Sequence, residues 1–232
     1  MRTFRIALAQ IDTIVGDLQG NLEKVIPDTN LAKAQSADLI AFPEMAITGY
    51  PVEDLVYKPS FLKASKEKML QAVRASSGIA LVIGFVDSNI NTYNAAALAY
   101  NGKLIDIYHK IHLPTYGVFD EDRYFKRGSQ QPVYKINGSH LGLNICEDIW
   151  YKDGPIVAQR KAGAEVIINI NASPYHIGKQ IERKEMITRR SIDNGVFIAY
   201  INAVGGQDEL VFDGASMVTN PQGQILVNGK QF

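Results

Sequence analysis

Cys146 is the only cysteine of the 232-residue chain, and it stands where an apolar run ends and polar residues begin. Open α/β sheets bind ligands at the carboxyl ends of their strands, so this position favours a functional side chain. A thiol is mostly protonated at neutral pH and needs a base and a cation to become a useful nucleophile. Most free cysteines are instead small buried apolar groups, so the interpretation depends on finding those partners.

Glu44 and Lys110 are the candidate partners. Glu44 follows an apolar run and Pro43, which removes a backbone donor and stops strand pairing. Lys110 follows another strand-like run. Glu44 could accept the thiol proton, while Lys110 and the backbone N–H of Glu147 stabilise the oxyanion of an acyl transfer. Taken alone, Glu44 is better explained as a solvated loop carboxylate, so the prediction depends on the whole set.

A metal centre is not expected. His109 and His112 are close in sequence, but strand alternation places them on opposite faces and disfavours a zinc pair. The predicted acyl transfer requires no histidine and no metal.

Short apolar runs and longer amphipathic stretches alternate along the chain and predict the elements that position these residues. Strands are predicted at residues 4–11, 39–42, 79–85, 93–100, 104–108, 141–145, 166–170, 196–202 and 212–219. Helices are predicted at residues 21–37, with a kink at Pro27, and at 61–75, 155–162 and 180–193.

The pair Asn101-Gly102 lies between two strand runs and is a strong signal for a β-hairpin. The sheet is therefore not purely parallel. No repeat and no Ser/Gly/Pro-rich linker divides the chain. We expect one α/β domain over residues 1–232, built from two mixed sheets that pack together and are flanked by helices.

Composition excludes several classes of partner. The 24 basic residues balance the 24 acidic ones without long blocks of one sign, so no nucleic-acid partner is expected. No apolar run approaches the roughly 20 residues of a membrane helix, and the amino terminus does not resemble a signal peptide. These features favour a cytoplasmic protein without a membrane partner.

Three motifs resemble those of the nitrilase (carbon-nitrogen hydrolase) superfamily in order and spacing. They are Pro43-Glu44, Lys110 with His112-Leu113-Pro114, and Cys146-Glu147-Asp148. Residues 43–55, 113–125, 171–175 and 202–214 resemble one branch, the amino-terminal glutaminase domain of glutamine-dependent NAD synthetases.

This resemblance implies a four-layer αββα fold, homo-oligomers and a set of roles. Glu44 is the implied general base and acid, Lys110 the oxyanion stabiliser and Cys146 the nucleophile that forms a thioester. Glu121 matches a second acidic residue that positions the substrate or the base. The implied substrate pocket for glutamine comprises Tyr116, Phe119, Glu147, Trp150, Ser173 and Lys179. Ser173 and Lys179 would bind the carboxylate of glutamine, and Glu147 its ammonium group.

The resemblance also implies a partner in the same polypeptide. The ammonia released here would feed an ATP-dependent synthetase domain that needs ATP and Mg and makes NAD, whereas the glutaminase domain needs no cofactor. Residues 205–208, Gly-Gly-Gln-Asp, lack both serines of the Ser-Gly-Gly-x-Asp-Ser loop of such domains and are rejected as an ATP site. The chain stops soon after a strand-like segment, 224–227, which favours a piece cut from a longer protein.

Two other functions stay open. The chain could be a stand-alone amidase or carbamoyl hydrolase of another small carboxamide. It could also be a catalytically silent regulatory module with the nitrilase fold, although all three catalytic positions are filled.

Overall fold

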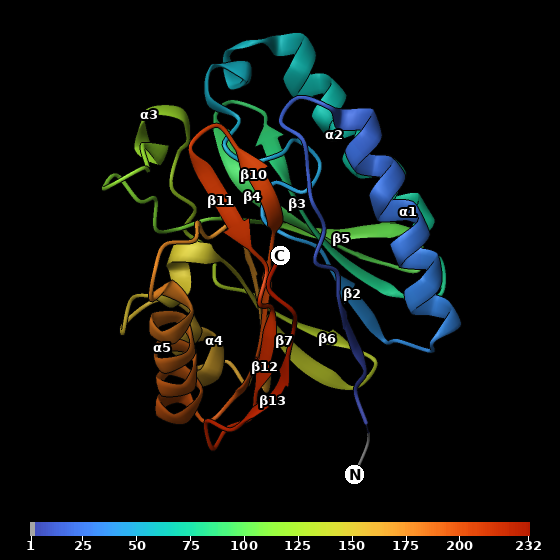
Figure 1. The fold of residues 1–232 in the computed structure, drawn as a ribbon. Coiled ribbons are helices and arrows are strands. Elements are labelled where there is room, and N and C mark those ends of the chain that lie inside the picture. Colours follow the sequence, from blue (N-terminus) through green and yellow to red (C-terminus); the bar gives the residue numbers. More distant parts are fainter. Residues whose placement is uncertain (1–2) are drawn as a thin grey trace.

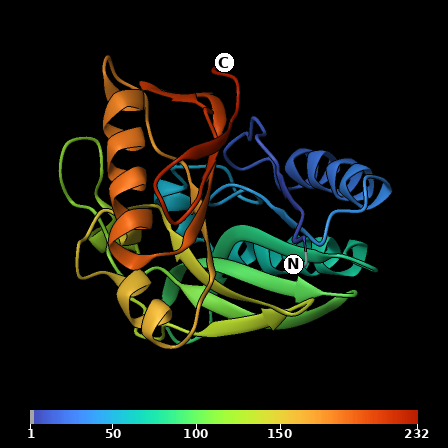
Figure 2. The same ribbon diagram turned by 90° about the horizontal axis from the view of Figure 1, so that it is seen from below.

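Two β-sheets lie face to face, and helices cover the outer side of each (Figure 1, Figure 2). The computed structural model describes residues 3–232. Helices α1 (Leu18–Ala34) and α2 (Pro59–Ala75) pack on one sheet, and α4 (Pro155–Lys161) and α5 (Lys179–Asn194) on the other. The predicted αββα sandwich is confirmed.

The first sheet has the order β1-β2-β3-β4-β5. Its strands are β1 (Ile6–Leu8), β2 (Leu39–Ala41), β3 (Ala80–Ser88), β4 (Thr92–Tyr100) and β5 (Lys103–His109). β1, β2 and β3 are parallel, and β4 and β5 form the hairpin predicted at Asn101-Gly102, where both residues have positive φ. β5 therefore runs in the same direction as β2, and the two strands end at the same edge.

The second sheet has the order β13-β12-β9-β8-β7-β6, with β7, β8 and β9 parallel. Its strands are β6 (Val133–Ile136), β7 (Ser139–Ile145), β8 (Val166–Asn171), β9 (Phe197–Asn202), β12 (Met217–Thr219) and β13 (Ile225–Asn228). A separate hairpin joins β10 (Val204–Gln207) to β11 (Leu210–Asp213).

Alternating residues of the central strands pack in two different cores. Leu143, Ile168 and Ala199 share one register row and face the first sheet. Ile167 and Ile198 face the helices on the outer side. Because both faces are buried, these strands appear in the sequence as continuous apolar runs without polar alternation.

Short helices connect the strands near the edge where β2, β5, β7 and β8 end. They are the 3-10 helices η1 (Glu53–Tyr57) and η2 (Cys146–Ile149) and the single-turn α3 (Glu121–Tyr124). Two predicted catalytic residues, Glu121 and Cys146, are the first residues of such helices. Among residues 3–232 no helix is both long and apolar enough to cross a membrane.

Some predicted boundaries are wrong. The strand predicted at 212–219 is two strands, β11 and β12, because the chain turns at Gly214 and Ala215, which both have positive φ. Glycine adopts this left-handed conformation without strain, and the side chain of Gln10 packs against Gly214, where a Cβ atom would lie 2.1 Å from its Nε2. The strand predicted at 4–11 is only β1, and the sequence did not indicate β6 or β10.

Candidate active site

Glu44 lies in a tight turn that crosses strand β3. The turn packs directly on Gly84, where a Cβ atom would lie 2.3 Å from the backbone nitrogen of Met45 and 2.4 Å from the carbonyl oxygen of Pro43. Met45 itself has a φ of 49°. Glycine at 84 therefore allows the turn to bring the Glu44 side chain inside the molecule, where it is buried.

Three donors fix the Glu44 carboxylate. Oε1 accepts hydrogen bonds from Lys110 Nζ at 2.8 Å and from Asn94 Nδ2 at 2.7 Å. Oε2 accepts one from the backbone N–H of Ala172 at 2.9 Å, just beyond the end of β8. Residues from both sheets thus converge on this carboxylate.

Lys110 is 1% exposed and lies between two carboxylates. Its Nζ donates to Glu44 Oε1 and to Glu121 Oε1, both at 2.8 Å. Burial alone would lower the pKa of Lys110, but the charges of Glu121 and Glu44 outweigh it and raise the pKa well above its ordinary value. The side chain is therefore an ammonium ion throughout the neutral range.

Glu121 completes the charged group. Its Oε1 also accepts from the Tyr50 hydroxyl at 3.0 Å, and its Oε2 from Asn94 Nδ2 at 3.3 Å. Burial raises the pKa of Glu121 to about 7 although the nearby Lys110 opposes the rise. Glu121 therefore titrates near neutral pH. Asn94 Nδ2 donates to both Glu44 and Glu121 and so links the two carboxylates.

Cys146 is presented by a strained turn at the end of β7. It is buried and has a φ of 42°, a left-handed conformation that non-glycine residues rarely adopt and that is often retained at functional sites. Burial and the charge of Glu44 raise the pKa of the thiol well above its ordinary value, although Lys110 acts in the opposite direction. The resting group is a neutral thiol, so Lys110 does not suffice to make a thiolate before substrate binds.

Asp148 connects the turn after Cys146 to the segment after Lys110. Its buried carboxylate accepts four hydrogen bonds, from the backbone N–H groups of Ile111, His112 and Ile145 and from the hydroxyl of Tyr108. The nucleophile and the cation are therefore held relative to each other by one shared side chain.

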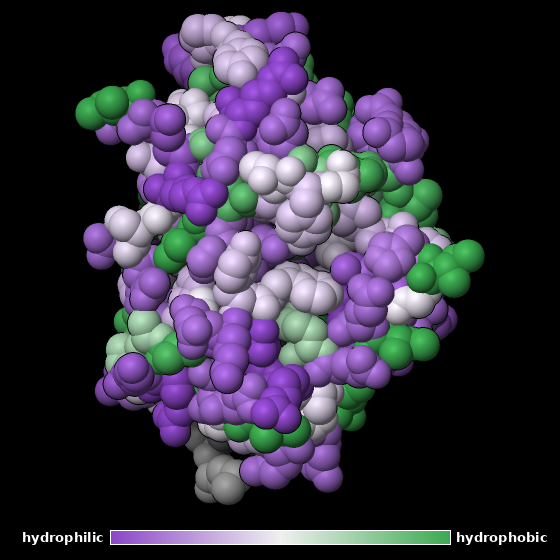
Figure 3. Space-filling view, turned by 90° about the vertical axis from the view of Figure 1, so that its left-hand side faces the viewer, coloured by the Kyte–Doolittle hydropathy of each residue, from purple (hydrophilic) through white to green (hydrophobic). Residues whose placement is uncertain are grey.

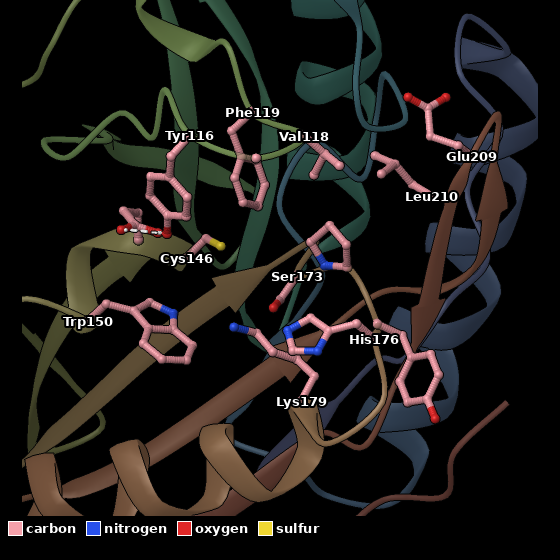
Figure 4. A pocket seen from close by; sticks show the side chains of 14 residues that line it. Tyr116, Val118, Phe119, Cys146, Trp150, Ser173, His176, Lys179, Glu209 and Leu210 are labelled. Atoms are coloured by element: carbon pink, nitrogen blue, oxygen red, sulfur yellow. Dashed lines mark hydrogen bonds between the residues drawn. The ribbon is translucent and has the colours of Figure 1, made fainter.

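A cavity of about 300 Å³ opens beside Cys146 and reaches the surface. Figure 4 shows the sulfur directed into this space, among aromatic and polar side chains. All six residues predicted to bind substrate line it, together with Gly117, Val118, Pro174, Tyr175, His176, Glu209 and Leu210, which the sequence did not indicate. The volume is at the lower end of the range for small-molecule sites.

The polar groups of this cavity are arranged on opposite walls. On one wall the Tyr116 hydroxyl donates to the Glu147 carboxylate, whose two oxygens lie 3.0 and 2.9 Å away. On the other, Lys179 Nζ lies 4.2 Å from the centre of the Trp150 ring, close to Ser173 (Figure 4). An acceptor and two donors thus face a common space that has aromatic sides.

The surface that carries α3 and α5 is chemically mixed. Hydrophilic side chains cover most of it, hydrophobic ones are scattered and lie largely toward its margins, and residues of intermediate hydropathy gather near its middle (Figure 3).

Across residues 3–232 no three His, Cys, Asp or Glu side chains are grouped so that they could hold a metal ion.

Asn94, Tyr50 and Arg183 are site residues that sequence reasoning missed. Of these three residues only Asn94 could have been noticed in the sequence, because this polar residue stands directly before the apolar run 95–99 of strand β4. Tyr50 and Arg183 look like ordinary loop and helix residues, and their partners lie 71 and 30 positions away in sequence.

Residues 5–232 match the sequence model of the family described as Carbon-nitrogen hydrolase. The glutamine-dependent NAD(+) synthetase of Thermotoga maritima is 44% identical to the chain over 236 residues. That alignment covers 100% of this chain and 41% of the relative, so the chain spans less than half the length of the curated relative it matches.

Solved structures share the fold. The glutamine-dependent NAD+ synthetase from Acinetobacter baumannii superposes with a TM-score of 0.93 at 37% identity, over 100% of this chain and 44% of that one. An amidase variant from Nesterenkonia sp. AN1 superposes with a TM-score of 0.86 at 27% identity, over 98% and 86% of the two chains. In that amidase the acetamide moiety of fluoroacetamide is covalently added at the active-site cysteine.

Proposed function

Because the chain belongs to the carbon-nitrogen hydrolase family, we propose that it hydrolyses the side-chain carboxamide of glutamine at Cys146 and releases ammonia. The observation that supports this proposal best is the buried group of Glu44, Lys110 and Glu121 around a thiol at the wall of a ligand-sized cavity. A base, a cation and a nucleophile are the components that amide hydrolysis requires.

In the first half of the reaction, the Cys146 sulfur attacks the amide carbon as Glu44 accepts the thiol proton. Because the raised pKa of Cys146 disfavours a free thiolate, we expect this transfer to accompany the attack. The carbonyl oxygen becomes an oxyanion that Lys110 Nζ and the backbone N–H of Glu147 stabilise. Glu44 then gives its proton to the nitrogen, the C–N bond breaks, and ammonia leaves a thioester behind.

In the second half, a water molecule attacks the thioester carbon. Glu44 accepts one proton from this water, and Lys110 again faces the oxyanion. The C–S bond breaks, the sulfur takes the proton back from Glu44, and glutamate leaves. Glu121 does not react in this scheme, and it holds the ammonium group of Lys110 from the side opposite Glu44.

Glutamine suits the distribution of charge in the cavity. Its α-ammonium group would pair with Glu147, and its α-carboxylate with the Ser173 hydroxyl and Lys179. The rings of Tyr116, Phe119 and Trp150 would enclose its methylene groups, and Glu147 and Tyr116 are already joined by a hydrogen bond.

We further propose that residues 1–232 are the glutaminase part of a longer polypeptide. The relatives it matches are more than twice as long and are glutamine-dependent NAD synthetases. The released ammonia would then pass to a synthetase domain in the same chain, where ATP and Mg act, in a cytoplasmic homo-oligomer.

Steady-state release of ammonia tests the proposal. We expect kcat/KM for glutamine to exceed that for propionamide by at least about 10²-fold, because buried polar groups left without partners penalise the wrong substrate strongly, and that for asparagine by about 10- to 200-fold, the value of one missing methylene. No release from glutamine under conditions where propionamide is hydrolysed would contradict it.

One observation favours a second candidate. The Nesterenkonia amidase shares the fold over 86% of its own length, so a chain of about this size can act as an amidase alone. A preference for propionamide over glutamine in the same assay would establish this alternative.

A further inference from the structure

Arg183 is the largest side chain that is wholly buried among residues 3–232, and no step of the proposed reaction uses it. It lies on α5, and its Nη1 pairs with the carboxylate of Asp213 at the end of β11. Buried pairs of this kind add little net stability, because desolvation cancels most of the attraction. A guanidinium group is, however, a rigid fork that can hold several acceptors in one geometry.

The other donors of Arg183 all reach the wall of the cavity. Nε donates to Ser173 Oγ at 3.2 Å, and Nη2 donates to the carbonyl oxygens of Ser173 at 2.7 Å and Pro174 at 3.0 Å. Asn202 holds the same residue from the other side, since its Oδ1 accepts from the Ser173 N–H at 2.9 Å. Ser173 therefore has a fixed backbone and a fixed hydroxyl oxygen.

These contacts also determine where the Ser173 hydrogen can point. Arg183 Nε can only donate, so it occupies a lone pair of Ser173 Oγ and leaves the hydroxyl hydrogen free. Within residues 3–232 the Ser173 hydroxyl accepts from Arg183 but donates to no protein acceptor, so its hydrogen is available to an acceptor in the cavity.

The same arginine anchors the start of α5. Lys179 lies four residues before Arg183 and therefore on the same side of the helix. Its Nζ contacts Glu182 at 3.2 Å and the Trp150 ring, at the edge of the cavity. Fixing Arg183 fixes the turn that carries Lys179, so one ion pair holds both donors of this wall.

We propose that the Arg183–Asp213 pair is a specificity determinant, which positions Ser173 Oγ and Lys179 Nζ to bind a carboxylate of the substrate. This inference rests on the proposed function, in which the substrate is an amino-acid amide. Arg183 does not touch the substrate and is a positioning residue. A merely structural role would lower the hydrolysis of every amide equally, whereas this role affects only amides that bear a carboxylate.

Four amides separate the two roles. Glutamine carries both charged groups, glutaramate only the carboxylate, 4-aminobutanamide only the ammonium, and butanamide neither. The variant Arg183→Met with Asp213→Leu removes both members of the pair, which avoids an unpaired buried charge. Arg183→Lys keeps the positive charge but lacks the planar set of guanidinium donors. Arg189→Met is the matched control, because Arg189 lies on the same helix, is 72% exposed and pairs only with Asp193 there.

For the double variant we expect kcat/KM for glutamine and glutaramate to fall about 10- to 100-fold through KM, the value of a hydrogen bond to a charged group. The two amides without a carboxylate should change by less than about threefold. Arg183→Lys should lie between wild type and the double variant, and Arg189→Met should match wild type. An equal loss on all four amides, or no loss on glutamine, would overturn the proposal.

The controls keep this test separate from the proposed function. If wild type prefers asparagine to glutamine and the double variant loses activity on both but not on the two amides without a carboxylate, the glutamine assignment fails and the role of the pair holds. A wild type that does not prefer glutaramate to butanamide overturns the role. If circular dichroism shows the double variant unfolded, Arg183→Lys and Ser173→Ala replace it, and both must reduce the preference for a carboxylate.

Discussion

The catalytic centre and the rim of the cavity are neighbours, but they are held in different ways. In the centre, Glu44, Lys110 and Glu121 are buried and each has at least two polar partners in the protein. On the rim, Tyr116 and Val118 are more than half exposed and lie on a loop between β5 and α3. The charges of the centre are therefore in place before substrate binds, whereas the loop between β5 and α3 presents exposed side chains that have room to adjust.

Because of this difference, variants of the centre and variants of the rim should change different kinetic constants. Preorganised charge acts on the transition state, so changes in the centre should lower kcat. Rim groups contact the substrate before and during the reaction, so changes there should act on KM. Variants of Cys146, Glu44, Lys110, Glu121 and Tyr116 test that division.

Cys146→Ala should lower turnover on the order of 10⁶-fold, the usual consequence of removing a covalent nucleophile. The fold should survive, because only one sulfur atom is lost from the end of β7. Ammonia release measures the first effect, and a melting temperature within a few degrees of wild type would show the second. Turnover near wild type would mean that another group attacks the amide.

Glu44→Gln should lower kcat by about 10²- to 10⁴-fold, because the amide is nearly isosteric but cannot accept the thiol proton. The matched control is Glu67→Gln on the exposed face of α2, which should leave kcat unchanged. A loss of only a few-fold for Glu44→Gln would assign the base to a different residue.

Lys110→Met should lower kcat by about 10²- to 10³-fold through loss of an oxyanion donor. It also leaves two carboxylates buried against each other, so the free energy of unfolding should fall by about 3–5 kcal/mol. Since Lys110 lowers the pKa of Cys146, alkylation by iodoacetamide should require a higher pH in the variant. An unchanged pH profile of alkylation would show that Lys110 does not lower the pKa of the thiol.

Glu121→Gln should change how stability depends on pH. The pKa of Glu121 is about 7 in the folded protein and about 4.5 ordinarily, so between these values the folded state binds more protons than the unfolded state. The free energy of unfolding attributable to Glu121 therefore falls as pH rises through this window. Melting curves from pH 4.5 to 7 should show a flatter dependence for Glu121→Gln than for wild type, and no flattening for the exposed control Asp122→Asn.

Tyr116→Phe should have the smallest effect, a rise in KM of about 3- to 10-fold with kcat nearly constant. The variant removes the hydroxyl that donates to Glu147, a hydrogen bond to a charged group near the surface. A fall in kcat as large as that of Glu44→Gln would show that Tyr116 acts on the transition state, and the proposed distinction between centre and rim would be wrong.

Much of the fold could be predicted from the sequence because the central strands are buried on both faces. Continuous apolar runs such as 141–145 and 166–170 are direct consequences of that burial. The break between β11 and β12 could not be predicted, since residues 212–219 resemble one strand in the sequence and are divided by the left-handed conformation of Gly214 and Ala215, which appears only in the folded chain. Short, partly exposed strands such as β10 carry too weak a pattern to detect.

The candidate site was visible in the sequence wherever a side chain that can act as a nucleophile, base or cation closely follows an apolar run. Glu44, Lys110 and Cys146 share that property, and the structure brings them to one edge, while their catalytic roles stay predictions. Asn94 and Arg183 could not be assigned, because their importance lies in partners that folding brings close from far along the chain. The neutral state of the thiol could not be predicted from the sequence either, because it depends on burial and on a local excess of carboxylates.

The suppressed ionisation of Cys146 has a consequence for redox chemistry. Peroxides and disulfides react with thiolates, and the rate follows the thiolate fraction and the accessibility of the sulfur. A buried thiol with a raised pKa is therefore a poor target for oxidation to a sulfenic acid or for glutathionylation while the cavity is empty. In a chain with one cysteine, the suppressed ionisation of the thiol therefore also preserves the nucleophile between turnovers.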